Sequence, residues 1–404
     1  MSEENGSAAL DVLHVTEACG GGVRRHLRLL IPALQARGVR CGLFAFGSRD
    51  EADFADDLSA LAALGCDVSF RHHEGKGLGE YWGSWRALRT LIAARRPRVL
   101  HLHAGVAGVL GRCGCRPYSD LRIVYSPHAF AFHPSLPKLR NCAVRGAERL
   151  LACNVDAYVF VGRSEIADAN LLGLPPERFQ LVENGLPDDY CATLLEPAVA
   201  RYKLEIAPGT IAVGVPCRLV RQKGLGVFLS AFAQVAEKHP AVQVLFCGDG
   251  PERENLQRQA ASLGLSGRVR FLGTVPDLSR KLTAFDLAML PSFYEGLSYV
   301  LLECLGAAVP LLVSDILANI PRPEFRECLE TFRVGDVGDL ALRLDYGLEH
   351  LELMRGKAQI GAELIRSEFM LSTQVDKLAL LYKRLARKCH GNGAAASIAE
   401  NEAK

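Results

Sequence analysis

The sequence predicts an α/β protein with two domains, each a parallel β-sheet with helices on both faces. The chain has 404 residues, whereas one domain usually holds about 100–200 residues. Short β-branched runs alternate with longer amphipathic stretches, which is the βαβα order typical of parallel sheets. This order occurs in two rounds, separated at Asn184-Gly185 and the nearby Pro187, residues that favour a turn.

The first round covers residues 1–188 and the second covers residues 189–370. We expect strands of the first domain at residues 12–15, 40–45, 99–103, 123–126 and 157–161, with helices that include 23–37 and 82–95. We expect strands of the second domain at residues 210–216, 243–247, 269–272, 287–290 and 310–313, with a helix at 225–238. A last helix is expected at residues 371–390, since Leu378, Leu381 and Leu385 form one apolar stripe. Residues 391–404 are rich in Gly, Ala and Asn and are expected to form a flexible tail.

Composition and charge indicate a globular enzyme without a strong global charge. Hydrophobic residues make up 49% of the chain, charged residues 23%, and the formal net charge is +2. The pattern shows neither a secretory leader nor a run of about 20 apolar residues that could span a bilayer. The thirteen cysteines are scattered along the chain and odd in number. We therefore interpret them as reduced, buried side chains of a cytoplasmic protein.

A basic turn follows the strand expected at residues 210–216. Arg218 and Lys223 lie five residues apart, and Gly224 comes next. A planar guanidinium and a compact ammonium in this arrangement suit a diphosphate. The alternative interpretation is a solvated basic turn of no special function.

Two carboxylates flank a predicted helix start in the most informative motif. Glu295 precedes Gly296, Leu297 and Ser298, and Glu303 is expected about two turns along a helix that starts around Leu297. The free N–H groups of such a helix end can receive a phosphate. Alternatively, Glu303 is an exposed helix residue and Glu295 only complements the helix dipole.

Glycines also follow strands at two other places. Gly20, Gly21 and Gly22 open the helix expected at residues 23–37, where they form either a loop that faces a phosphate or acceptor, or a plain tight turn. Gly248 and Gly250 lie after the strand expected at residues 243–247. That segment either packs against a nucleoside or is an ordinary connection.

Histidines occur at two further strand ends. His101 and His103 share a face of their strand, so together they could bind zinc, but no Cys, Asp or Glu cluster is close in the sequence. We therefore expect no metal site. His128 follows the strand expected at residues 123–126, a position at which a histidine is more often structural.

The ordered set of motifs resembles the retaining GT-B glycosyltransferases of the family 4 class, over nearly the whole chain. The C-terminal motifs are specific as a set, and the N-terminal ones look most like those of bacterial polysaccharide or O-antigen assembly enzymes. The matching segments are 14–16, 20–22, 100–103, 107–112, 125–128, 184–185, Arg218 with 223–224, 248–251, and Glu295 with Glu303, which are separated by seven residues. The sequence departs from the pattern at Cys217, where relatives have Gly, and at Arg98, where they often have Asp.

The resemblance implies roles for individual residues. Arg218 and Lys223 would hold the donor diphosphate, Glu303 the ribose and Glu295 the transferred sugar. The implied catalytic residues are His128, Glu295, Arg218 and Lys223. The implied donor contacts are Gly21, Gly22, Arg218, Lys223, Gly250, Glu295, Gly296, Leu297, Ser298 and Glu303. The resemblance also implies that the two domains face each other across a cleft and that the last helix packs back on the first domain.

The implied reaction is a metal-independent, retaining transfer of a hexose from a UDP- or GDP-sugar to a hydroxyl of a glycan or lipid-linked acceptor, in surface polysaccharide or O-antigen synthesis. No cofactor besides the nucleotide-sugar is expected. Two alternatives remain open: a sugar-nucleotide epimerase with the same architecture, and a non-catalytic scaffold that binds a nucleotide-sugar.

A basic region covers residues 81–149. It contains twelve Lys or Arg but only two Asp or Glu, and aromatic residues are interleaved with them. Such a region suits an anionic membrane surface, here the inner face of the plasma membrane, or a lipid-diphosphate acceptor. The alternative is a set of scattered, solvated helix faces. We expect no nucleic-acid partner, since no recognition motif is present.

Overall fold

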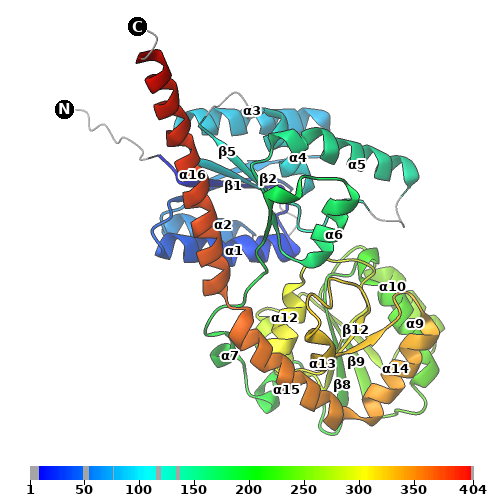
Figure 1. Ribbon diagram of the computed structural model, residues 1–404. Coiled ribbons are helices and arrows are strands. Elements are labelled where there is room, and N and C mark those ends of the chain that lie inside the picture. Colours follow the sequence, from blue (N-terminus) through cyan, green and yellow to red (C-terminus); the bar gives the residue numbers. More distant parts are fainter. Residues whose placement is uncertain (1–8, 49–53, 76, 115–119, 133–136, 402–404) are drawn as a thin grey trace. The chain divides into compact units, whose positions relative to one another are not determined.

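The computed structural model describes residues 9–48, 54–75, 77–114, 120–132 and 137–401. The chain divides into two compact units (Figure 1). The N-terminal unit comprises Met1–Glu183 and Leu371–Lys404, and the C-terminal unit comprises Asn184–Met370. The break predicted after residue 188 lies a few residues beyond this division.

The described part of the N-terminal unit contains a seven-stranded parallel sheet in the order β3-β2-β1-β4-β5-β6-β7. Its strands are β1 (Val12–Thr16), β2 (Cys41–Gly47), β3 (Asp67–His72), β4 (Val99–His103), β5 (Arg122–Ser126), β6 (Ala157–Phe160) and β7 (Phe179–Leu181). Its α-helices are α1 (Gly21–Ala36), α2 (Phe54–Ala63), α3 (Leu78–Arg95), α4 (Gly105–Gly114), α5 (Lys138–Leu151), α6 (Arg163–Leu171) and α16 (Leu371–Asn401).

Alternate residues of the central strand β1 enter apolar clusters on opposite faces of this sheet. Val12 packs with α1 and α16, whereas Leu13 and Val15 pack with α3 and α4. Figure 1 shows α1, α2 and α16 on one side of the sheet and α3, α4 and α5 on the other. The last helix thus packs on the N-terminal unit through its predicted leucine stripe, Leu378, Leu381 and Leu385.

The described part of the C-terminal unit contains a six-stranded parallel sheet in the order β10-β9-β8-β11-β12-β13. Its strands are β8 (Ile211–Pro216), β9 (Val242–Cys247), β10 (Val269–Gly273), β11 (Leu287–Leu290), β12 (Leu311–Ser314) and β13 (Glu330–Phe332). Its α-helices are α7 (Tyr190–Thr193), α8 (Pro197–Lys203), α9 (Leu225–Val235), α10 (Arg253–Ser262), α11 (Leu278–Lys281), α12 (Tyr299–Gly306), α13 (Phe325–Cys328), α14 (Val337–Glu349) and α15 (Leu351–Glu368).

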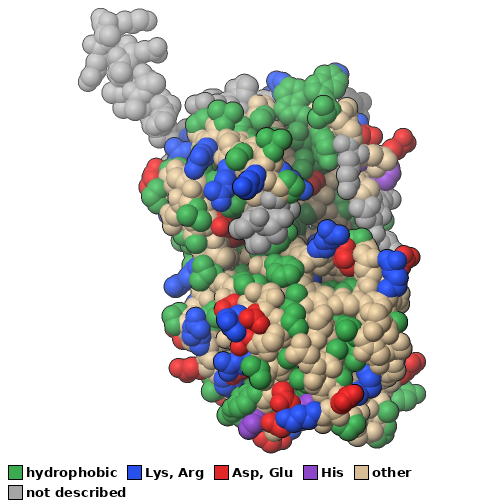
Figure 2. Space-filling view, turned by 90° about the vertical axis from the view of Figure 1, so that its right-hand side faces the viewer, with side chains coloured by type: hydrophobic (Ala, Val, Ile, Leu, Met, Phe, Trp, Pro, Cys, Tyr) green, Lys and Arg blue, Asp and Glu red, His purple; other side chains and the backbone are tan. Residues whose placement is uncertain are grey.

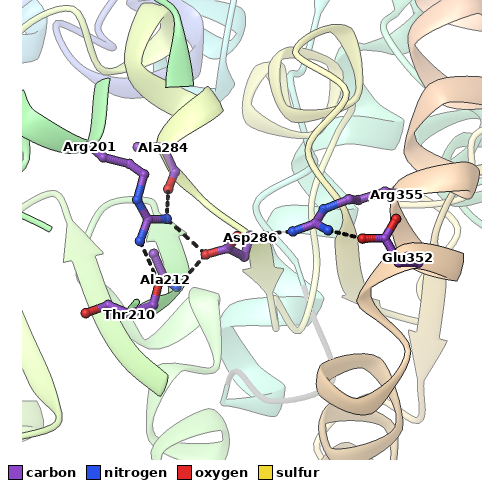
Figure 3. A network of polar contacts seen from close by, with 7 residues as sticks. All are labelled: Arg201, Thr210, Ala212, Ala284, Asp286, Glu352 and Arg355. Carbon is purple, nitrogen blue, oxygen red and sulfur yellow. Dashed lines mark hydrogen bonds and ion pairs between the residues drawn. The ribbon is translucent and has the colours of Figure 1, made fainter. Parts of the chain in front are cut away.

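A polar network around Asp286 ties four elements of the C-terminal unit together (Figure 3). The Asp286 carboxylate, just before β11, accepts from Arg201 Nη1 of α8 at 3.0 Å and from the backbone N–H of Ala212 in β8 at 2.8 Å. Arg355 of α15 reaches the other carboxylate oxygen at 3.4 Å and also pairs with Glu352. The network lies at the amino ends of β8 and β11, away from the carboxyl ends where ligands of such sheets bind.

The predicted fold class is confirmed, and the differences lie at element ends and sheet edges. Helix α1 begins at Gly21 rather than near Val23, and α12 begins at Tyr299 rather than around Leu297. Glu303 is therefore little more than one turn into α12. Helix α16 continues to Asn401, past residue 390, over a run of alanines that favours helix. Within the described residues, no helix has both the length and the apolar character needed to cross a membrane.

Candidate active site

A charged pair lies at the carboxyl ends of β8 and β11 in the C-terminal unit. Lys223, in the 3₁₀ turn Arg221–Lys223, forms an ion pair with Glu295 from the loop after β11. The same Glu295 oxygen accepts from Ser292 Oγ at 2.8 Å, and the other oxygen lies 3.4 Å from Gln222 Nε2. Neighbouring parallel strands end at the same edge of the sheet, which is why residues so distant in sequence meet here.

The backbones of these two loops are also joined. Gln222 O accepts from the N–H of Phe293 at 2.8 Å, and Gln222 Nε2 donates to Tyr294 O at 2.8 Å. Gly224 follows with φ of 62°, and a Cβ there would lie 2.1 Å from Pro291 O. Only glycine fits this position, so the glycine after Lys223 lets the two loops approach each other.

The electrostatics of the pair keep Lys223 charged. Burial by itself would lower the pKa of Lys223, but the Glu295 carboxylate beside it more than compensates, so that this pKa lies above its ordinary value. The site therefore holds a positive and a negative group together in a partly buried position. An incoming phosphate can replace the Glu295 carboxylate as the partner of the Lys223 ammonium group.

The two arginines of the basic turn have different surroundings. Arg218 is exposed, directly after β8 and Cys217. Arg221 is 89% exposed and pairs with Glu252 at 3.4 Å. Both arginines are therefore exposed on the connection that carries Lys223, and Arg221 pairs with a carboxylate of the loop after β9.

The segment Gly296, Leu297 and Ser298 leads into α12, with Ser298 in the N-cap position. Leu297 is buried, and its backbone O accepts from Asn184 Nδ2 at 2.8 Å, which fixes the entry to the helix. The helix starts only a few residues after Glu295, so its positive end belongs to the same strand-end region. Glu303 lies on this helix with only 6% of its surface exposed. The interpretation of Glu303 as an exposed helix residue is therefore wrong.

Gly250 belongs to the loop after β9, which approaches the loop after β8. Its φ is 158°, and a Cβ would lie 2.4 Å from Leu219 O. Leu219 N–H donates to Asp249 O at 2.9 Å, and Glu252 N–H donates to Leu219 O at 3.0 Å. The lack of a side chain at Gly250 therefore lets this loop approach the loop that carries Arg218.

The predicted residues of the N-terminal unit also lie at strand ends. Gly21 and Gly22 are the first two residues of α1, and Gly22 is exposed. Glu17, just before them, accepts from the N–H groups of Val106 and Ala107 at 2.8 Å each and so caps α4. The loop after β1 is thereby tied to the loop after β4.

His128 lies in a strained turn after β5. Both His128 and Ala129 have positive φ, 52° and 87°, in a region that residues with a Cβ rarely adopt. The buried Glu165 carboxylate of α6 accepts from the N–H groups of Ala129 and Val161 at 2.6 Å each. Burial raises the pKa of Glu165 to about 7, although these N–H groups oppose the shift. The turn that contains His128 is thus fixed by a hydrogen bond from its backbone to the Glu165 carboxylate.

His128 belongs to a cluster of histidines that the sequence predicts only in part. His101 and His103 do share a face of β4, with ring centroids 4.0 Å apart. His14 joins them because it pairs in register with His101 on the neighbouring strand, and His26 of α1 contacts His128 edge-on at 4.8 Å. The register of β1 and β4 was the missing information, since it cannot be inferred from either strand alone.

The other contributors that sequence reasoning missed are Gln222, Ser292, Glu17 and Glu165. Each contributes a hydrogen-bonding side chain of a common residue type. None of them stands at a spacing from other residues that would mark it as part of a site. The absence of a metal stays a prediction. One ring nitrogen from each of His14, His101 and His103 lies within 4.8 Å of the other two, and the same holds for His26, His103 and His128.

The basic region is less uniform than predicted. Arg112 is fully buried, where it donates to Glu148 at 2.8 Å, and Arg122 pairs with Asp156 at 3.4 Å. Phe130 and Phe132 are buried instead of lying at the surface. Arg116 lies outside the described residues. What remains exposed on α3 and α5 is a mixture of cations and large apolar side chains.

Both halves of the chain match family models of glycosyltransferases. Residues 20–190 match the model described as "Glycosyltransferase Family 4", and residues 200–322 match the one described as "Glycosyl transferases group 1". EpsD of Bacillus subtilis, named as a glycosyltransferase, is 24% identical over 305 residues, which cover 74% of this chain and 79% of EpsD.

A second relative and a solved structure agree with these matches. UDP-Gal:alpha-D-GlcNAc-diphosphoundecaprenol alpha-1,3-galactosyltransferase of Escherichia coli is 24% identical over 238 residues, 58% of this chain and 62% of that enzyme. This chain thus spans less than two thirds of the galactosyltransferase. HepE of Anabaena, solved with UDP and glucose, has the same fold, with a TM-score of 0.76 at 19% identity over 93% of this chain and 99% of HepE. Since the two models together cover most of the chain and the fold agrees with them, the chain belongs to the group 1, family 4 class of GT-B glycosyltransferases.

Proposed function

We propose that the chain is a retaining, metal-independent hexosyltransferase that uses a UDP- or GDP-sugar and a hydroxyl of a glycan or lipid-linked acceptor. The observation that carries this proposal is the ion pair of Lys223 with Glu295, on two loops that also present Arg218 and the start of α12. Two cations and a helix N-terminus match the charge of a nucleoside diphosphate, and a carboxylate matches sugar hydroxyls.

In the proposed reaction, the bond from the anomeric carbon to the donor phosphate oxygen breaks and a bond to the acceptor oxygen forms on the same face. The acceptor hydroxyl passes its proton to the leaving diphosphate oxygen, so no protein base is required. Arg218 and Lys223 stabilise the negative charge that develops on the diphosphate. Glu295 positions the transferred sugar, and the buried Glu303 contacts the ribose.

Family membership favours transfer over the two alternative functions. An epimerase would consume no acceptor, and a scaffold would release no nucleotide. The names of two relatives support the substrate class: HepE was solved with UDP and glucose, and the Escherichia coli relative is named for a UDP-sugar donor and a lipid-diphosphate acceptor. We extend these substrates to this chain, in surface polysaccharide synthesis, as part of the proposal.

Titration calorimetry with UDP and GDP in EDTA tests the donor site. We expect one nucleotide to bind without added metal, and Lys223→Ala and Arg218→Ala each to weaken binding about 10- to 100-fold, the value of a charged hydrogen bond. Arg221→Ala is the matched control, because this exposed arginine lies between them on the same turn. Equal weakening in all three variants would contradict the assignment, and binding that requires Mg²⁺ would contradict metal independence.

We also propose that the N-terminal unit attaches to the cytoplasmic face of the plasma membrane through α3 and α5. Leu78 and Trp82 on α3 are 88% and 58% exposed, and Leu139 and Leu150 on α5 are 84% and 75% exposed. Cations lie among them, and Figure 2 shows Lys and Arg side chains among hydrophobic ones on the surface of this unit. Apolar and basic side chains together suit an anionic lipid surface.

Flotation with liposomes that contain anionic lipid tests the membrane proposal. The double variant Lys138→Glu/Arg140→Glu should lose most of the binding at low salt. A control of equal charge change, Lys203→Glu/Arg366→Glu, alters exposed residues of the C-terminal unit and should float like the unmodified protein. Failure of the unmodified protein to float would overturn the proposal.

A further inference from the structure

Three histidines of the N-terminal unit form a chain of hydrogen-bonded rings that ends at His128. His14 Nδ1 lies 3.0 Å from His103 Nε2, and His103 Nδ1 lies 3.0 Å from His128 Nε2. His14 and His103 are completely buried, while His128 is partly exposed. Both ring nitrogens of His103 therefore have a hydrogen-bond partner: Nε2 contacts the buried His14, and Nδ1 contacts His128.

This geometry fits hydrogen bonds better than a metal site. A zinc ion needs imidazole lone pairs that converge on one point, each nitrogen about 2.0–2.1 Å from the ion. In the tetrahedral geometry of zinc, two such nitrogens lie about 3.3–3.4 Å apart, and the lone pair of each points at the ion and not at the other nitrogen. In this chain the facing nitrogens are 3.0 Å apart, the ordinary length of a hydrogen bond.

Each ring of the chain is neutral near pH 7. Burial lowers the pKa of His14 to about 3 and holds the pKa values of His103 and His128 well below the ordinary value. A neutral imidazole carries one N–H and one bare nitrogen, so each ring can donate at most one hydrogen bond and accept at most one. The direction of donation must consequently be the same along the whole chain.

The inner end of the chain decides this direction. Among the described residues, none forms a hydrogen bond with the buried His14 Nε2. A buried N–H without a partner is rarer in proteins than a buried acceptor without one, so Nε2 is the bare nitrogen and Nδ1 carries the proton. His14 then donates to His103, and His103 donates to His128.

We propose that His14 and His103 are positioning residues that hold His128 in the tautomer with its proton on Nδ1, so that it presents a hydrogen-bond donor. The proposal rests on the proposed function and on the catalytic role that the family resemblance implies for His128 beside the reacting sugar. An N–H in this position donates to a sugar hydroxyl, whereas the opposite tautomer would offer only a bare nitrogen. His101 is not part of the chain, because its two nitrogens contact Tyr382 and Ser126.

The tautomer can be observed directly by ¹⁵N NMR of protein with ¹⁵N-labelled histidine, since protonated and bare ring nitrogens have distinct shifts. The His128 signals are assigned by their loss in His128→Phe. We expect His128 to carry its proton on Nδ1 in the unmodified protein. A proton on Nε2 would overturn the proposal without recourse to any further variant.

Variants of His103 separate this positioning role from a structural one. His103→Leu removes the donor and should give His128 a mixture of tautomers, with kcat lower by about 10- to 100-fold, the usual effect of losing such an outer partner, and KM for the donor nearly unchanged. His103→Asn keeps an N–H in place of Nδ1 and should restore both the tautomer and most of kcat. His101→Leu is the matched control, a buried histidine on the same strand.

Three results would contradict the proposal. The first is an unchanged His128 tautomer in His103→Leu, and the second is an equal loss of kcat in His101→Leu. The third is one equivalent of tightly bound zinc in the purified protein, which would make the cluster a metal site. If the protein transfers no sugar, the proposed function fails, but the NMR measurement still decides the tautomer.

Discussion

At the scale of single residues, a substitution at the contact of Lys223 with Glu295 should affect nucleotide binding and catalysis differently. Without the carboxylate, burial lowers the pKa of Lys223, because Glu295 is the main group that raises it. We expect Glu295→Gln to bind UDP or GDP at pH 7 at least as tightly as the unmodified protein, since Lys223 no longer divides its charge between two anions. The kcat of transfer should fall by about 100-fold, as for other single groups that act on the transition state.

The measurements are nucleotide titration and steady-state kinetics at several pH values. As the pH rises, nucleotide binding should weaken in both proteins once Lys223 loses its proton. In Glu295→Gln this should occur at a lower pH than in the unmodified protein, because the pKa of Lys223 is lower without the carboxylate. Ser292→Ala, which removes only a hydroxyl at 2.8 Å from Glu295, serves as the control with a small effect. A Glu295→Gln variant with normal kcat would show that Glu295 does not position the sugar.

The sequence was sufficient to find the charged residues of the site but not their neighbours. Lys223 and Gly224 belong to one motif and Glu295 to another, and the spacing within each motif made these residues recognisable. Gln222 and Ser292 were missed, because Gln and Ser occur in most turns and their role depends on which loop lies opposite. Glu165 was missed for a similar reason, since its contact with the turn at His128 spans two loops that only the fold brings together.

At the scale of elements, the loop after β8 depends on Gly224. An alanine there would place a Cβ 2.1 Å from Pro291 O and would hold an unfavourable φ of 62°. We expect Gly224→Ala to destabilise the C-terminal unit by about 2 kcal/mol or more and to abolish nucleotide binding, because the loops of Lys223 and Glu295 can no longer approach. Gly267→Ala, where the added Cβ meets nothing within 4 Å, is the control.

Urea unfolding and nucleotide titration of both variants give the two required values. If Gly224→Ala bound nucleotide normally, the close approach of the two loops would not be needed for the donor site. Equal destabilisation by Gly267→Ala would point to a general effect of alanine in turns instead.

The Asp286 network offers a stability prediction that leaves the site untouched. Asp286→Ala removes the acceptor for Arg201 and for the N–H of Ala212, so we expect a loss of about 1–3 kcal/mol from the C-terminal unit. Glu352→Ala removes an 87% exposed partner of Arg355 and should change stability by less than about 0.5 kcal/mol. Both tryptophans of the chain, Trp82 and Trp85, lie on α3. The effect of Asp286→Ala should therefore be visible by circular dichroism but not by tryptophan fluorescence.

The strands show which parts of the fold could be predicted. Central strands such as β1, β8 and β11 are buried on both faces, and β8 and β11 consist of continuous apolar runs while β1 is mostly apolar around His14, so their positions were predicted closely. The strands that were missed, β3, β7 and β13, are all at sheet edges. Edge strands are half exposed and mix polar with apolar residues, and β7 and β13 have only three residues each. Such segments form strands because a neighbour offers hydrogen bonds, and the local sequence does not encode that neighbour.

At the scale of the whole molecule, the buried histidines should make the two units respond differently to acid. In the N-terminal unit, burial lowers the pKa values of His14, His101, His103 and His128, whereas an unfolded histidine titrates near 6.5. Below pH 6.5 the unfolded chain therefore binds protons that the folded chain does not. Their contribution to stability is complete above pH 6.5 and is lost as the pH falls, in the case of His14 down to about pH 3.

Buried carboxyl groups in the same unit act in the opposite direction. Burial raises the pKa of Glu165 to about 7 and that of Asp168 to about 6, and it also raises the pKa of Glu17. These groups bind protons more tightly in the folded state, so their contribution is present at low pH and is lost as the pH rises through these values. These four histidines outnumber the three carboxyl groups, and burial also lowers the pKa of His73 in the same unit. Each group contributes about 1 kcal/mol per pH unit within its window. We therefore expect a net loss of stability on acidification from pH 7 to 5.5.

Urea unfolding followed by tryptophan fluorescence isolates this effect, because both tryptophans belong to the N-terminal unit. The fluorescence midpoint should fall between pH 7 and pH 5.5. In Glu165→Gln it should fall more steeply, since one opposing group has been removed while the histidines remain. A parallel or shallower decline in Glu165→Gln would mean that Glu165 is ionised throughout this range. A midpoint that changes with pH in neither the unmodified protein nor Glu165→Gln would mean that the histidine cluster takes up protons in the folded state, which the close contacts of its rings make unfavourable.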